Sequence, residues 1–202
     1  MQDRATNKRR TRLRLMRGVL LTIQRHGIGG LTTGRVAGLA GIAQPTFYVH
    51  FRNMDEALEE TASKVAGRFD VALAPSQASS AQHPSAALHD AVSQCTRALV
   101  ADATVADVFM RCRRDRGTPL GRAWTLLMQR LHLRMTELVF RVRPGISPPL
   151  ATLHAEMLVG IVLALAEGTI EGRIQDLEQA TQIASRAVVA SVLVEPSAAD
   201  AA

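Results

Sequence analysis

A chain of 202 residues, 47% of them hydrophobic, is long enough for one large domain or for a small domain joined to a larger one, and it excludes general disorder. Aromatic residues make up only 3%, which favours helices packed through aliphatic side chains over a sheet. The net charge of +6 is unevenly distributed along the chain. Residues 1–52 carry ten basic residues and one acidic residue, whereas residues 53–202 carry 14 basic and 17 acidic residues. The basic quarter predicts contact with a polyanion, and a solvated basic tail is the alternative.

Cysteine usage and hydropathy predict a cytoplasmic protein that does not enter membranes. Cys95 and Cys112 have neither CxxC nor metal-ligand spacing, as expected of reduced structural thiols. The N-terminus lacks the apolar stretch of a secretory signal. The longest apolar run, residues 157–166, is too short to cross a bilayer.

The first three predicted helices are closely spaced. The first covers residues 8–26, and its apolar residues recur at steps of three and four: Leu13, Met16, Leu20 and Ile23. Thr32 and Thr33 then offer N-cap hydroxyls for a short helix that Gly41 ends. A third short helix has Pro45 in its first turn, where a missing N–H removes no helical hydrogen bond.

Six longer helices are predicted beyond this point. The fourth covers residues 54–73 and is followed by a polar loop at 75–84. The next five cover residues 85–101, 103–114, 118–142, 149–171 and 176–194. No segment alternates in the manner of a strand, so the predicted fold class is all-α, with about nine helices.

Residues 31–58 read LTTGRVAGLAGIAQPTFYVHFRNMDEAL, which places two short helices around Gly41 between longer ones. This arrangement predicts a helix-turn-helix. Within it, the stretch GLTTGRVAGLAGIAQPTFYVHFRN, with its QPT-x-Y-x-H run, resembles the DNA-binding domain of the TetR family of transcriptional regulators. The resemblance covers about residues 8–60, and beyond them only the helix pattern agrees.

The resemblance implies a domain organisation and a partner. It implies a three-helix DNA-binding domain at residues 1–53, a sensing and dimerisation bundle at 54–194, and a tail at 195–202. The partner would be a double-stranded DNA operator, read by the helix at 44–50 in the major groove. The expected DNA-binding residues are Thr33, Gln44, Pro45, Thr46, Tyr48, His50, Arg10 and Arg52.

The expected contacts differ from residue to residue. Gln44 would hydrogen-bond a base edge, Thr46 would reach a base or a phosphate, and Pro45 would touch a thymine methyl. Tyr48 and His50 correspond to residues that touch the DNA backbone in the family; internal packing and a helix-end role are the respective alternatives. The basic cluster at residues 8–14 would add phosphate or minor-groove contacts that raise affinity more than specificity.

Three departures from the family pattern bear on the operator. Ala43 stands where the family usually has a polar N-cap, and Gly34 lacks a side chain that could reach a base. Met54 replaces a lysine that could contact phosphate, although Arg52 lies nearby. We therefore expect an operator that differs from the tetracycline one.

The last two helices favour a homodimer. The helices at 149–171 and 176–194 have apolar faces too broad for a single partner, which a four-helix bundle between two copies would cover. Burial in a monomer core is the alternative. The resemblance further implies an effector pocket in the helical body, for a hydrophobic small molecule. Its candidate lining residues are Phe69, Leu99, Phe109, Met110, Trp124, Leu127, Met128, Leu131 and Met157.

A second resemblance gives an alternative effector. The segment FMRCRRDRGTPLGRAW resembles the corresponding part of repressors of unsaturated fatty-acid synthesis, which sense acyl thioesters. Its four arginines, Arg111, Arg113, Arg114 and Arg116, would then bind the coenzyme phosphates, and a solvated charged turn is the simpler interpretation.

The function that we expect is a homodimeric repressor, released from a palindromic operator by a hydrophobic ligand. Activation and a DNA-binding adaptor with a ligand-free body remain open. No GxSxG, P-loop, HExxH or GxGxxG motif is present, and neither cysteine shows a nucleophile signature, so we expect no enzyme, no cofactor and no metal.

Overall fold

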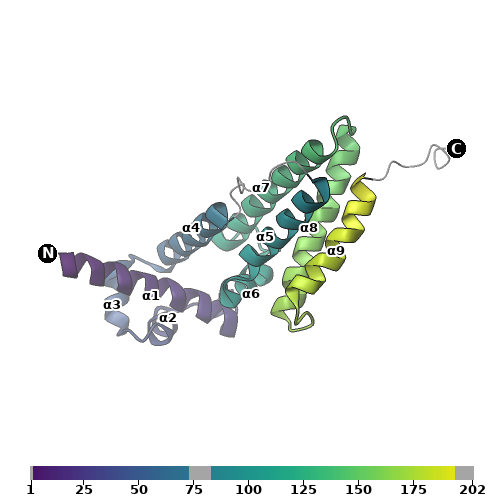
Figure 1. Cartoon of the computed structure of the whole chain (residues 1–202). Coiled ribbons are helices and arrows are strands. Elements are labelled where there is room, and N and C mark those ends of the chain that lie inside the picture. Colours follow the sequence, from purple (N-terminus) through teal and green to yellow (C-terminus); the bar gives the residue numbers. More distant parts are fainter. Residues whose placement is uncertain (1, 73–82, 194–202) are drawn as a thin grey trace. The chain divides into compact units, whose positions relative to one another are not determined.

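A computed structural model describes residues 2–72 and 83–193, and these residues form nine α-helices, one short 3-10 helix and no strand (Figure 1). The α-helices are α1 (Gln2–His26), α2 (Thr33–Leu39), α3 (Gln44–His50), α4 (Met54–Ala72), α5 (Pro84–Val100), α6 (Ala103–Cys112), α7 (Pro119–Val142), α8 (Pro148–Ile170) and α9 (Leu177–Leu193). The predicted all-α class with about nine helices is confirmed. The predicted tail at 195–202, and the loop at 75–84 up to residue 82, lie outside the described residues.

The described residues divide into two compact units. The first comprises residues 2–68 and 102–125, and the second comprises residues 69–72, 83–101 and 126–193. The helix-turn-helix therefore belongs to the same unit as α6 and the beginning of α7.

The first unit is built around the inner face of α1. Leu15, Val19 and Ile23 are buried on this face, and α2, α3 and α6 pack on α1. The closest approach is at Gly18, where an added Cβ would lie 2.4 Å from the backbone oxygen of Val36 in α2. Gly41 makes the turn between α2 and α3 at φ 63°, a backbone conformation that glycine adopts without steric strain.

In the second unit, α5, α8 and α9 lie side by side (Figure 1). α8 is the one helix among the described residues that is long and apolar enough to cross a membrane. Its apolar composition is also that of a core helix, because Ala151, Leu158 and Val162 are buried in this packing.

His154 is a buried polar residue in this apolar helix. Its Nδ1 has no hydrogen-bond partner among the described residues. Burial, together with the charge of Arg143, lowers the pKa of the imidazole below its ordinary value of 6.5. The folded protein therefore keeps His154 neutral at a pH where the unfolded chain already binds a proton.

We expect this difference to make folding stability depend on pH. As pH falls from about 6.5 through the lower folded pKa, the unfolded state takes up the proton first, so the free energy of unfolding decreases. Urea denaturation from pH 7.5 to 5 measures the slope. His154→Leu should flatten the curve relative to the wild type, and parallel curves for the two proteins would contradict the assignment.

Candidate nucleic-acid interface

Three of the expected DNA-binding residues meet on the outer side of the helix-turn-helix. The Thr32 hydroxyl accepts the Arg35 N–H at 3.3 Å and caps α2, which leaves the neighbouring Thr33 hydroxyl free of capping. Gln44 Nε2 donates to Thr33 Oγ1 at 3.0 Å. The Tyr48 hydroxyl lies 3.4 Å from the same oxygen. Thr33 lies 11 positions before Gln44 and 15 before Tyr48 in the sequence, and the fold joins the three residues into one polar cluster.

The exposed face of α3 is wider than the sequence motif indicates. Phe47 is fully buried, and Tyr48 packs edge-on against its ring. Gln44 and Pro45 are exposed at the start of the helix. Val49 continues this face and is 68% exposed, yet sequence reasoning missed it. Helical spacing from Pro45 would have placed Val49 there, four residues further on.

His50 is placed differently from the other predicted contacts. Its side chain is buried, and its Nδ1 has no partner among the described residues. Burial and the nearby charges of Arg12 and Lys8 lower the pKa of the imidazole. At neutral pH the neutral ring therefore lies in the protein interior, and the backbone carbonyl of His50 makes the polar contact described next. A contact between this side chain and DNA stays a prediction.

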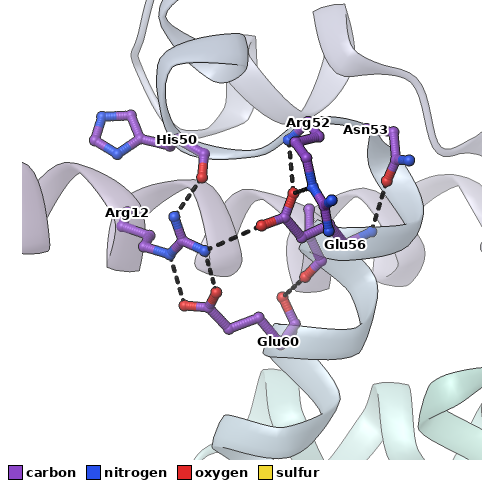
Figure 2. Close-up of polar contacts among 8 residues, drawn as sticks. Arg12, His50, Arg52, Asn53, Glu56 and Glu60 are labelled. Atoms are coloured by element: carbon purple, nitrogen blue, oxygen red, sulfur yellow. Dashed lines mark hydrogen bonds and ion pairs between the residues drawn. The ribbon is translucent and has the colours of Figure 1, made fainter.

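Arg12 joins three helices of the first unit (Figure 2). Its guanidinium holds both carboxylate oxygens of Glu60 in α4, with Nε 2.7 Å from Oε1, and it also donates to the His50 carbonyl at the end of α3. Its Cζ lies 4.3 Å from the centre of the Phe51 ring. Hydrogen bonding to Arg12 lowers the pKa of Glu60, so the pair is ionised at neutral pH.

Glu56 completes this network on the α4 side (Figure 2). Its carboxylate accepts the Arg52 backbone N–H at 2.7 Å and Arg52 Nε at 3.1 Å, and the first of these contacts is the main cause of its lowered pKa. Asn53 Oδ1 accepts the Glu56 N–H at 2.8 Å and thereby caps the beginning of α4. The Arg52 side chain is 88% exposed.

The basic cluster of α1 divides into two groups. Arg10 and its neighbours Lys8 and Arg9 are exposed and available to an anion. Arg12 is used internally, and Arg14 donates to the carbonyls of Ala40 and Gly41 at 2.8 and 2.9 Å, where it holds the end of α2. The basic charge at residues 8–14 is thus partly structural, which a count of charges does not reveal.

The candidate effector residues fall into the two units. In the first, Phe109 and Trp124 pack edge to face with ring centres 6.1 Å apart, and Met110 is half-buried. The candidates of the second unit are Phe69, Leu99, Leu127, Met128, Leu131 and Met157. Met157 is the exposed member of this group, at 41%.

The two cysteines are free and buried, as the sequence predicts for structural thiols. Burial raises the pKa of each to about 11. Little thiolate is present at neutral pH, so neither side chain is prepared to act as a nucleophile.

Comparison with known proteins agrees with this geometry. Residues 22–61 match the family model of bacterial regulatory proteins of the tetR family. A TetR-like transcriptional regulator from Rhodococcus sp. RHA1 superposes with a TM-score of 0.72 at 17% identity, over 92% of this chain and 97% of that one. A second transcriptional regulator from Rhodococcus sp. Rha1 superposes with a TM-score of 0.65 at 21% identity, over 92% of this chain and 99% of that one.

A third similar structure is the transcriptional regulator FadR from Bacillus subtilis, solved in complex with stearoyl-CoA. Its TM-score is 0.60 at 14% identity, over 88% of this chain and 97% of that one. No curated protein matches the chain by sequence. The matched segment and the fold agree: residues 22–61 carry the DNA-binding helix-turn-helix of the tetR family of bacterial regulatory proteins, and the chain shares the all-helical fold of solved TetR-like transcriptional regulators.

Proposed function

We propose that the protein is a cytoplasmic, homodimeric repressor that occupies a palindromic operator and is released from it by a hydrophobic small molecule. The observation that carries the DNA-binding part is the exposed polar cluster of Gln44, Thr33 and Tyr48, which lies in the same unit as the exposed cations of α1. Gln44 reads a base edge, and Arg10 and its neighbours neutralise phosphates.

Exposed apolar residues on the last two helices support the homodimer. Leu153 and Met157 are exposed one turn apart on α8, and Gly160 and Ala164 continue the same face. On α9, Ile183 is 64% exposed. A second copy that covers these faces removes apolar surface from water and presents two recognition helices, as a palindrome requires.

Selection of bound sequences from random duplex DNA tests this function. We expect a palindrome with half-sites about one helical turn, ~34 Å, apart. Gln44→Ala should relax base preference at one position per half-site, by about 1–3 kcal/mol in discrimination. Arg10→Ala should lower the affinity for all DNA sequences alike, and it should reduce the slope of log affinity against log salt concentration by about 1. If both variants lose affinity uniformly, Gln44 does not read a base.

The effector part of the proposal has two versions. The first is an uncharged hydrophobic ligand held by apolar side chains of the second unit, such as Phe69, Leu99 and Leu131, which are buried there. The second is an acyl thioester. It is supported by the similarity to a regulator solved with stearoyl-CoA and by the exposed Arg111, Arg114 and Arg116 around the end of α6.

Titration of stearoyl-CoA into the protein–DNA complex separates the two versions. If acyl thioesters are the effectors, fluorescence anisotropy of labelled operator should fall as stearoyl-CoA is added, and unacylated coenzyme A should release the DNA more weakly. Arg114→Gln with Arg116→Gln should then raise the concentration of stearoyl-CoA needed. Unchanged anisotropy would leave the uncharged hydrophobic ligand as the proposed effector.

A further inference from the structure

A concave site lies inside the first unit, between α1 and α4, and the function proposed above does not use it. The pocket has a volume of about 360 Å³, within the range of small-molecule sites. Its lining combines an apolar wall with a cluster of charged side chains. All of these residues belong to the first unit.

The apolar wall is incompletely covered. Met16, Leu20 and Val65 form its buried part. Leu13 belongs to the same apolar stripe of α1 as Met16 and Leu20, yet it is 43% exposed at the pocket. An apolar occupant would remove this remaining surface from water.

The charged part of the lining favours an anion. Arg17, Lys64 and Arg68 supply three cations against the single carboxylate of Asp102. Asp102 is already engaged, because Arg17 Nη1 lies 2.8 Å from Oδ1 and Asp102 accepts the Thr104 and Val105 N–H groups as the N-cap of α6. Arg68 is held more loosely, because its Nη1 lies 3.7 Å from Asp102 Oδ2. Arg68 and the exposed Lys64 are therefore the cations best able to turn toward a ligand.

We propose that this pocket binds an amphipathic monoanion, specifically a medium-chain carboxylate. The alkyl chain lies against Met16, Leu20 and Val65, and the carboxylate meets Lys64 and Arg68. The ligand carboxylate competes with Asp102 for Arg68. None of the candidate effector residues lines this α1–α4 pocket, so the inference does not rest on the effector proposal.

Calorimetric titration of the full chain with decanoate, in the absence of DNA, tests the proposal. Decanoate should bind at the pocket, and decanol, which lacks the charge, and acetate, which lacks the chain, should each bind about tenfold more weakly or worse. The double variant Lys64→Gln/Arg68→Gln should bind decanoate about tenfold more weakly than the wild type, and its affinity for decanol should be unchanged.

Two further variants provide a control for net charge and a second test of the pocket. Arg122→Gln/Arg173→Gln removes the same net charge from exposed, ion-paired positions outside the pocket, and it should bind decanoate as the wild type does. Leu13→Glu places a carboxylate at the exposed edge of the pocket and should also weaken decanoate. Circular dichroism verifies that each variant is folded.

The calorimetric results test the pocket proposal independently of DNA binding. Absence of decanoate binding, equal affinity for decanol, or wild-type affinity in both Leu13→Glu and the Lys64/Arg68 variant would overturn the proposal. Failure of the operator experiments would leave it untouched, because calorimetry measures the ligand alone.

Discussion

Replacement of Arg12 by alanine should destabilise the protein by about 2–3 kcal/mol, because it leaves Glu60 and the His50 carbonyl without their shared donor. The Glu60 side chain is 38% exposed, and solvent screening therefore keeps the expected loss below that of a fully buried pair. The end of α3 is also released from α1, so affinity for DNA should fall by about tenfold in protein that is still folded. Urea denaturation and operator titration measure the two effects.

Matched variants separate the geometry of this network from its charge. Arg12→Lys keeps the charge but cannot hold two carboxylate oxygens and a carbonyl together, so it should recover little stability. Arg52→Ala removes an exposed ion pair with Glu56 and should cost only about 0.3–0.5 kcal/mol. A double-mutant cycle with Glu60→Gln should show a coupling energy of about 0.5–3 kcal/mol, and additive losses would refute the Arg12–Glu60 interaction.

The second large effect is expected from Gly18→Ala, a single added methyl group. Its Cβ would lie 2.4 Å from the Val36 carbonyl oxygen and 3.2 Å from the Ala40 Cβ. These groups belong to the backbone and to a short side chain, so α2 must move away from α1. We expect a loss of about 3 kcal/mol, larger than the gain of about 1 kcal/mol that alanine brings to a helix. Affinity for DNA should fall as well, since α2 and α3 move together.

Gly38→Ala is the matched control for this substitution. Gly38 lies in α2 with no atom within 4 Å of an added Cβ, so the helix gains alanine without a collision. The unfolding free energy should rise by about 0.5–1 kcal/mol. Chemical denaturation should show that Gly18→Ala lowers the free energy of unfolding and that Gly38→Ala raises it. A change of the same sign in both variants would contradict the close contact between α1 and α2 at Gly18.

Sequence periodicity was sufficient for the helices and their order. Pro119 and Pro148 begin their helices within one residue of the predicted positions, because a missing N–H and a fixed φ favour the first turn. The predicted start of the first helix at residue 8 is wrong, since α1 begins at Gln2. Residues 2–7 carry no apolar pattern, but Gln2, Arg4 and Ala5 among them propagate a helix well once it has formed.

Interactions between distant positions could not be predicted from local patterns. Arg12 looks like its neighbours Arg9 and Arg10 in the sequence, and only its contact with Glu60, 48 residues away, distinguishes it. The burial of His50 has the same origin, because helical spacing identifies a face but not the element that covers it. By contrast, the polar cluster at Gln44 involves one short motif, and its members were all anticipated.

The brevity of α3 has a practical consequence. It has seven residues, and Ala43 supplies no side-chain cap at its beginning. A helix this short does not persist alone in water, since its first turn costs more than its few hydrogen bonds return. A synthetic peptide of residues 44–50 would therefore be a random coil, and operator preference could be transplanted to another protein only with the whole three-helix scaffold.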